Sequence, residues 1–227
     1  MAFTYSPKIV TDGLVRYLDA GNTYSYVSGS TDWNDLSRSQ ISGSLVNGPI
    51  FTGSNGGAIV FDGINDYVSI PTYTFGNGNW AVNMWVNTSA SYIGTFGPLI
   101  SNSSGGPVSL LLTIYNNKIN FRNYSGVWVD NTGSSTLNTN QWYMLTWVNY
   151  AGVVAQSGSG QVFVNGVSDS STFNSYTTNG GPCDVIAGYV NSTFYKGRIA
   201  TTQIYTKSLS AQEVLQNFNA TKGRYGY

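Results

Sequence analysis

A period-two alternation of side chains runs along much of this chain and limits what it can fold into. Every second side chain from Trp80 to Val86 is apolar, which places them together on one face of an extended segment. Residues 142–149 alternate in the same way. A period of two is typical of a strand, whereas a helix repeats about every 3.6 residues. The chain is therefore predicted to be all-β.

Two turn signals place hairpins between the predicted strands. Asn116-Asn117 separates an apolar segment, 110–115, from a second strand-like segment, 118–124. Asn tolerates the positive φ angles of a tight turn. Asn165-Gly166 is the strongest hairpin signal in the chain. Many short strands joined by such turns favour an antiparallel sandwich.

One helix is expected, near the C-terminal end. Ser210-Ala211-Gln212-Glu213 has the spacing of a capping box, in which the Ser and Glu side chains satisfy backbone amides at the helix start. Apolar residues then follow at helical spacing, and Gly223 is placed to end the helix. Glu213 is accordingly assigned to capping rather than to chemistry.

Charged side chains are scarce, which argues against several classes of function. They make up 9% of the chain, against roughly 25% in typical domains. Ser, Asn, Thr and Gly together fill 101 of the 227 positions, and ten acidic residues balance ten basic ones. A neutral chain offers no basic face for phosphates or for anionic lipids. We predict no nucleic-acid partner and no membrane insertion.

The residues on which most catalytic sites depend are also missing. The chain has no His, one Cys (Cys183) and one Glu (Glu213). Glycoside hydrolysis generally needs two carboxyl groups across the scissile bond, and the nine Asp residues are scattered. We therefore expect no catalytic residues and no enzyme activity, and we expect Cys183 to act as a small buried apolar residue.

Residues 1–227 are predicted to form a single domain, because no linker or shift in composition divides them. No run approaches the roughly 18 apolar residues of a membrane span. Residues 1–12 lack the apolar run of a signal peptide, so the protein is expected to be made in a cytoplasm.

Four stretches of the sequence resemble the concanavalin A-like, laminin G-type jelly-roll domains. The most specific is Phe61-Asp62-Gly63-Ile64-Asn65-Asp66-Tyr67. The N-terminal form, with Leu18-Asp19-Ala20-Gly21-Asn22, is similar to stand-alone copies carried by tailed bacteriophages. The stretches that carry the resemblance are 13–22 with 33–37 and 45–49, 58–68 with 79–85, 141–147 with 162–166, and 197–200 with 204–205 and 209–210.

This resemblance implies a two-sheet antiparallel jelly-roll sandwich with one short C-terminal helix. We expect about 12 to 14 strands. The segments 13–18 and 198–205 occupy the same neighbourhood in such folds, which would bring the two ends of the chain together. The fold hosts lectins, glycosidases, adhesion modules and virion proteins, so function has to come from a site.

Candidate sites are few. Calcium sits at the rims of some domains of this fold, and Asp62 and Asp66 are the candidate metal ligands, followed by Asp32 and Asp35. The alternative is that these carboxylates cap turns. No other cofactor is expected. The 17 Tyr, six Trp and many Asn residues would suit sugar binding, but they also describe a neutral polar surface.

The leading interpretation is a bacteriophage virion structural protein on the particle surface. It would be a capsid decoration or a fibre or tail appendage, with weak adhesion to host glycans. The expected partners are other virion proteins and further copies of the chain, with a trimer as the predicted state. The alternative is a free carbohydrate-binding lectin module.

Overall fold

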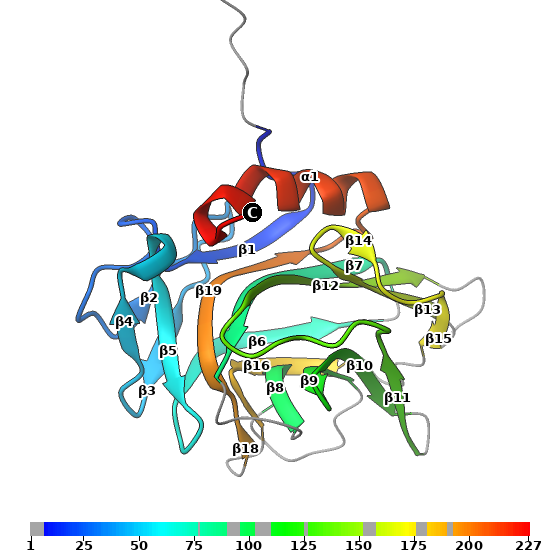
Figure 1. Cartoon of the computed structure of the whole chain (residues 1–227), viewed down its shortest axis with the longest axis horizontal. Coiled ribbons are helices and arrows are strands. Elements are labelled where there is room, and N and C mark those ends of the chain that lie inside the picture. The colour runs from blue at the N-terminus through cyan, green and yellow to red at the C-terminus, as the bar shows by residue number, and fades with distance from the viewer. Residues whose placement is uncertain are drawn as a thin grey trace, which may run out of the picture.

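The computed structural model describes residues 7–76, 78–89, 96–102, 110–124, 127–151, 158–175, 181–189 and 193–227. Two antiparallel sheets pack face to face, and one helix lies across the outside of one of them (Figure 1). We call the sheet that carries the helix sheet A and the other sheet B. This is the predicted jelly-roll sandwich.

Sheet A has nine strands. In spatial order they are β14 (Val167–Ser168), β13 (Gly158–Val164), β12 (Trp142–Ala151), β7 (Trp80–Thr88), β19 (Lys196–Tyr205), β5 (Ala58–Asp62) and β4 (Ile50–Thr52), with β1 (Leu14–Asp19) paired to β19 and β15 (Phe173–Ser175) paired to β13.

Sheet B has eight strands, and a separate two-stranded ribbon contacts it. The order in sheet B is β11 (Trp128–Thr132), β10 (Lys118–Tyr124), β9 (Leu110–Tyr115), β8 (Phe96–Ser101), β16 (Gly181–Ile186), β6 (Tyr67–Phe75), β3 (Gly43–Val46) and β2 (Asp32–Trp33); the ribbon is β17 (Gly188–Tyr189) with β18 (Thr193–Phe194).

The described chain has 19 strands, more than the sequence predicted. Six of them are only two or three residues long: β2, β4, β14, β15, β17 and β18. The other 13 fall in the predicted range. The extra strands are short edge pairings, which have too few residues to leave an alternating pattern in the sequence.

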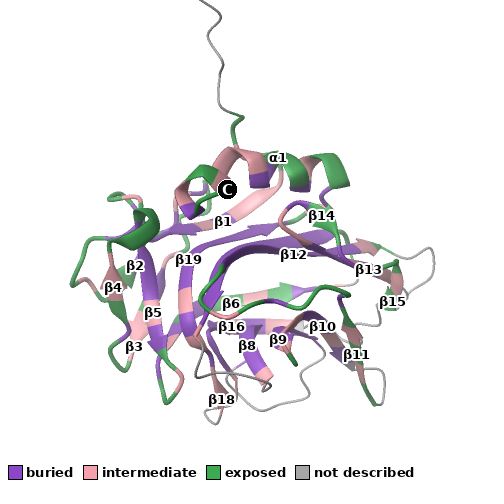
Figure 2. Ribbon diagram, viewed as in Figure 1, coloured by how far each residue is buried: buried purple, intermediate pink, exposed green. Residues whose placement is uncertain are grey.

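The main core lies between the sheets and follows the predicted alternation. Val82, Met84 and Val86 of β7 face inward, opposite the inward residues of sheet B. Figure 2 shows buried residues running along the central strands of both sheets. Large side chains such as Trp33, Trp147 and Phe121 fill this layer, and their burial supplies much of the driving force for folding.

Both predicted hairpin turns are present. Asn116 and Asn117 have φ angles of 48° and 59° and join β9 to β10. Asn165 and Gly166 have φ angles of 52° and 82° and join β13 to β14. Positive φ at both central residues matches the right-handed twist of the flanking strands, so these turns fix the strand registers.

Helix α1 (Ala211–Thr221) begins and ends where the sequence predicts. Ser210 and Glu213 form the complete capping box. The chain then tightens into a 3-10 turn, η2 (Lys222–Tyr225), and Gly226 rather than Gly223 takes the left-handed conformation. The reason is packing: Tyr225 must turn inward to stack on Trp85 of sheet A, with ring centroids 4.0 Å apart.

The two ends of the described chain lie on the same side of the molecule. β1 pairs directly with β19, as the sequence predicts. The amide of Gln216 in α1 donates to the Lys8 carbonyl at 2.7 Å, and the first described residues lie beside the helix (Figure 1). The outer face of sheet B is on the opposite side. No helix within the described ranges is long and apolar enough to cross a membrane.

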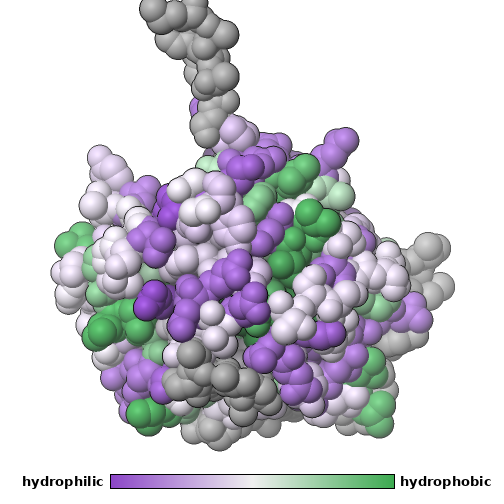
Figure 3. Space-filling view, in the orientation of Figure 1, coloured by the Kyte–Doolittle hydropathy of each residue, from purple (hydrophilic) through white to green (hydrophobic). Residues whose placement is uncertain are grey.

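The surface is as neutral as the composition implies. Figure 3 shows one face as a mixture of hydrophilic and near-neutral residues with small, separate hydrophobic areas. The second short 3-10 segment, η1 (Ser54–Gly56), lies in the loop between β4 and β5.

Candidate functional site

The two predicted metal ligands, Asp62 and Asp66, flank the turn after β5. Asp62 Oδ1 accepts hydrogen bonds from the amides of Ile64 at 2.8 Å and Asn65 at 3.3 Å. Asp66 Oδ2 accepts from the amide of Asp62 at 3.1 Å. These bonds are the turn-capping arrangement that the sequence left open as the alternative.

The turn also sets the charge of the two carboxyl groups in opposite directions. Burial opposes ionisation of Asp62, but hydrogen bonds from the turn amides outweigh it, so the pKa of Asp62 lies below its ordinary value. Burial raises the pKa of Asp66, and the neighbouring Asp62 charge adds to the increase, although the Asp62 amide acts against it.

Across the described ranges, no group of three or more His, Cys, Asp or Glu side chains is arranged to hold a metal ion. In the second pair, Asp35 accepts from the amides of Tyr17, Ser37 and Ile41 and from the Ser37 hydroxyl. Calcium binding at Asp62 and Asp66 stays a prediction.

Cys183 lies in the core between the sheets, where its Sγ donates to the Ser101 carbonyl at 2.9 Å. Burial raises the pKa of this thiol well above its ordinary value, so it is protonated at neutral pH. Its surroundings are those of a small core residue.

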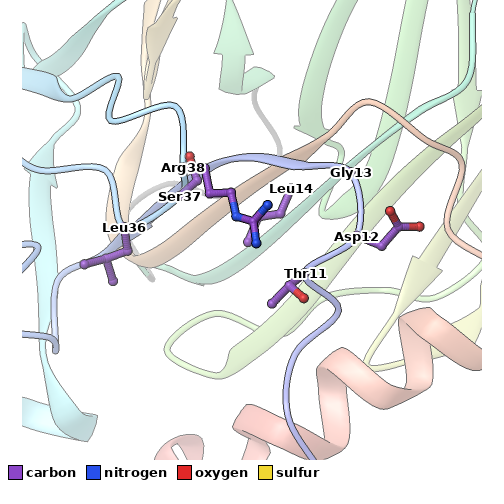
Figure 4. A pocket seen from close by; sticks show the side chains of 7 residues that line it. All are labelled: Thr11, Asp12, Gly13, Leu14, Leu36, Ser37 and Arg38. Atoms are coloured by element: carbon purple, nitrogen blue, oxygen red, sulfur yellow. The ribbon is translucent and has the colours of Figure 1, made fainter.

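A cleft of about 590 Å³ lies between the start of β1 and the loop at residues 36–38. Figure 4 shows Arg38 reaching across it from that loop. Asp12, on the other side, is paired with Lys207 at 2.9 Å. The described residues that line it include no aromatic ring on which a sugar could stack. This cleft therefore lacks the usual basis of glycan recognition.

A better site lies on the outer face of sheet B, at strands β10 and β11. Ile119 and Phe121 of β10 point into the core, so Asn120 and Arg122 between them point outward. The antiparallel register places Asp130 of β11 directly opposite Arg122. Trp128, two residues before Asp130, falls on the same face. We call Phe96, Asn120, Arg122, Trp128 and Asp130 the Arg122 cluster.

The Arg122 guanidinium is held between two aromatic rings. Its carbon lies 5.4 Å from the Phe96 ring centroid and 5.3 Å from that of Trp128, both within cation–π range. Arg122 Nε is 3.1 Å from Asp130 Oδ1. This contact is an ion pair rather than an aligned hydrogen bond, because Nε finds no hydrogen-bond acceptor.

Asn120 holds the Asp130 carboxylate in place. Its Nδ2 donates to Asp130 Oδ1 at 2.8 Å, and its Oδ1 accepts from the Thr132 hydroxyl at 3.4 Å. The Trp128 side of the cluster is open, since 37% of that residue is exposed. The cluster thus combines a partly exposed ring, a cation with terminal N–H groups and an oriented carboxylate.

Sequence reasoning did not single out these residues. The cluster assembles from three strands, β8, β10 and β11. Register places Asp130 opposite Arg122, whereas Phe96 is in line with Lys118, and the long Arg122 side chain reaches its ring. One signal was present: Asn120 and Arg122 alternate with apolar core residues beside a recognisable hairpin turn, which marks them as outward-facing.

Comparison with known proteins supports the fold. A family model described as the concanavalin A-like lectin/glucanases superfamily matches residues 62–215. No curated protein sequence matches the chain.

Among solved structures, three illustrate the likeness. Domain 4 of a GH43 extracellular arabinanase from Geobacillus stearothermophilus, in complex with arabinotriose, is 16% identical with a TM-score of 0.68, over 92% of this chain and 99% of that one. The binding domain of Paraclostridial Mosquitocidal Protein 1 is 16% identical with a TM-score of 0.67, over 92% of this chain and 52% of the other.

The third is a mutant Trypanosoma rangeli sialidase that displays trans-sialidase activity, 16% identical with a TM-score of 0.66, over 96% of this chain and 34% of that one. The chain therefore spans nearly all of the arabinanase domain, about half of the toxin domain and about a third of the sialidase. At these identities the likeness shows the fold alone.

Proposed function

Because the chain belongs to the concanavalin A-like lectin/glucanases superfamily, we propose that it is a glycan-binding module and that the Arg122 cluster is its binding surface. The observation that carries the proposal is the partly exposed Trp128 ring next to the partly exposed side chains of Arg122 and Asp130. The arabinotriose complex of the structurally similar arabinanase domain supports the same class of ligand.

The chemistry of the cluster suits a sugar. A pyranose or furanose ring has an apolar C–H face that packs on an indole and hydroxyl groups that need donors and acceptors at fixed angles. Asp130, held by Asn120, can accept from sugar hydroxyls. The terminal nitrogens of Arg122 can donate to them, since they have no hydrogen-bond acceptor among the described residues.

A glycan array with matched variants tests this proposal. Trp128→Ala should weaken binding about tenfold or more, because it removes the exposed ring from the centre of the surface. Tyr24→Ala is the control: Tyr24 is 85% exposed but lies on another loop, far from the cluster in the sheet order. Unchanged binding by Trp128→Ala, or equal losses in the two variants, would refute the assignment of the surface.

The module is proposed to bind without covalent chemistry. The Arg122 cluster contains one carboxylate, Asp130, whereas glycoside hydrolysis generally needs two, about 5–10 Å apart. Incubation with arabinan, laminarin, alginate, agar, peptidoglycan and lipopolysaccharide, with and without calcium, should release no products. Reducing ends that disappear in the Asp130→Asn or Asp62→Asn protein would contradict this proposal.

The finer proposal is that the module is displayed on a bacteriophage particle, on the capsid or on a fibre or tail. Both described ends of the chain lie on the helix side, while the Arg122 cluster faces the opposite way. Attachment through the ends would therefore leave the cluster pointing outward. The neutral surface and the single buried cysteine suit such a component.

Particle composition and assembly state test the display proposal. Mass spectrometry of purified phage particles should detect the chain, and sedimentation should show a homo-oligomer, with a trimer expected. Because charged groups are few, association should depend only weakly on salt. Absence from the particles would leave the free lectin module as the surviving proposal.

A further inference from the structure

A second polar pocket lies on sheet A, away from the Arg122 cluster. Its volume is about 210 Å³, below the roughly 300–1,000 Å³ of pockets for drug-sized ligands, so it suits a single small molecule. The side chains that matter for its chemistry are Asp62, Asn87, Asn140, Lys196 and Arg198.

Strand register explains why these side chains meet. Lys196 of β19 is paired with Asp62 of β5, and Arg198 is paired with Val60 of β5 on one side and with Asn87 of β7 on the other. Their neighbours Phe61, Val86 and Ile199 point into the core, so this set points outward. Helix α1 covers the other end of the same face, and the lower part of β19 runs away from it (Figure 1).

Among the described residues, the cationic side chains of this pocket and the Asn87 amide have no polar partner. Asn87 is only 3% exposed, and no hydrogen bond joins its side chain to a described residue. Over the described ranges, Lys196 and Arg198 take part in no ion pair. These groups are therefore free to bind a ligand.

The position of Lys196 is fixed by the adjacent turn. A Cβ at Gly63, where φ is 75°, would come within 2.6 Å of the Lys196 Cβ, so the lysine stem packs directly against the glycine. Gly197, which also lines the pocket, has equally little space beside it: a Cβ there would lie 2.5 Å from the Asn87 carbonyl oxygen. The pocket is thus built on close backbone contacts and is formed before any ligand arrives.

The charges select the ligand. Two cationic side chains and one carboxylate leave one net positive charge. One oxygen of Asp62 accepts hydrogen bonds from turn amides, and the carboxylate stays ionised. Its negative charge would therefore repel a dianion such as phosphate. We propose that this pocket binds a small organic ligand through a single carboxylate, with Arg198 and Lys196 as cations and Asn87 as hydrogen-bond donor.

Nuclear magnetic resonance titrations with four probes test the class of ligand. Glucuronate should shift the Asn87 amide and Arg198 side-chain resonances, and glucose should not. Acetate should shift the same resonances, because it carries the carboxylate that the pocket is proposed to recognise. If glucose binds like glucuronate, or phosphate binds more tightly than either carboxylate, the proposal is overturned. Acetate that leaves these resonances unmoved would also overturn it.

Three variants should change the affinity for glucuronate in opposite directions. Asn87→Asp keeps the shape of the side chain but adds a negative charge, and Arg198→Gln removes a positive one. Each should weaken glucuronate binding about tenfold or more. Asp62→Asn should strengthen it several-fold, because the net charge of the pocket rises while the turn acceptor is kept. Were the pocket a cation site, Asp62→Asn would instead abolish calcium binding and leave glucuronate without effect.

The control variants separate this site from others. Arg38→Gln removes the same charge from the cleft beside β1 and should leave glucuronate binding unchanged. Trp128→Ala should also leave it unchanged, so failure at the Arg122 cluster would not count against this pocket. Melting temperatures of all variants should stay near that of the parent. A loss of binding in Asn87→Asp equal to that in Arg38→Gln would contradict the assignment.

Discussion

On the outer face of sheet A, Asn83 donates to Gln203 at 2.8 Å and accepts from Thr146 at 2.7 Å, and all three side chains are buried. On the outer face of sheet B, Asn120 and Arg122 bind Asp130 beside a partly exposed Trp128. The two faces use the same kinds of side chain. Helix α1 covers the first set. In the second set Asn120 is buried, but Arg122, Trp128 and Asp130 stay partly exposed.

The buried network on sheet A attaches the helix. Asn217 of α1 donates to the Tyr205 hydroxyl at 3.1 Å. The single proton of that hydroxyl has two acceptors within reach, the Val10 carbonyl at 3.2 Å and the Gln203 Oε1 at 3.3 Å. Polar side chains on an outward strand face therefore do not identify a binding site by themselves. Such side chains can bind a ligand only where no other element of the fold occupies their hydrogen-bonding groups.

The largest expected difference in the free energy of unfolding is between Ala substitutions of two tryptophans, one on each face. Trp85 stacks on Tyr225 and Phe218 beneath the helix and donates to the Thr221 hydroxyl at 2.8 Å. Trp85→Ala should lower the free energy of unfolding by about 3–5 kcal/mol, through the cavity it leaves. Trp128→Ala should cost below about 1.5 kcal/mol. Urea unfolding measures both, and equal losses would break the comparison.

The buried network that attaches helix α1 to sheet A gives the next largest effect on stability. Asn217 Oδ1 accepts from the buried Val10 amide at 2.8 Å. Asn217→Ala leaves that amide without its partner and should cost about 2–3 kcal/mol. Asn219→Ala, two residues further along the same helix, is the matched control and should be neutral or slightly stabilising. Similar melting temperatures for the two variants would show that the network does not hold the helix.

The helix cap gives a smaller effect. The Ser210 hydroxyl accepts from the Glu213 amide at 3.2 Å. Ser210→Ala should therefore lower the free energy of unfolding by about 1 kcal/mol, as loss of an N-cap usually does. Glycan binding at the Arg122 cluster should not change, since the cap lies on the opposite side of the sandwich. A joint loss of stability and binding would mean that the two faces are coupled.

The smallest effect depends on pH. Burial opposes ionisation of Glu213, but bonds from Lys207 and Ser210 outweigh it, so the pKa of Glu213 lies below its ordinary value of 4.5. A depressed carboxyl pKa stabilises the fold above the ordinary value, and this stabilisation is lost as the pH falls through the folded value. Glu213→Gln should cost about 0.5 kcal/mol at pH 7 and nothing near pH 3. A constant difference between those pH values would contradict this.

Local chemistry made much of the fold predictable from the sequence. The hairpin turns at Asn116-Asn117 and Asn165-Gly166, the cap at Ser210 and the pairing of the two ends each depend on a few adjacent residues or on a family motif. The α-helix ends just before Gly223, as predicted, but the left-handed glycine is Gly226, which follows a 3-10 turn that packs Tyr225 on Trp85.

Partners that are distant in sequence were harder to predict. The indole N–H groups of Trp80, Trp85 and Trp147 each donate a hydrogen bond. Those of Trp33 and Trp142 are buried without a partner, and no local sequence signal distinguishes the two groups. The Arg122 cluster was missed for a related reason: it forms through strand register, which the sequence predicted only near the turns.

The central claim is that the outer face of sheet B is the glycan-binding surface, and the six indole N–H resonances of the protein test it most directly. Trp33, Trp80, Trp85, Trp142 and Trp147 are buried, and Trp128 alone is exposed. A titration with the glycan selected on the array should move the Trp128 resonance and leave the other five in place. Saturable binding with an unmoved Trp128 resonance would contradict the claim.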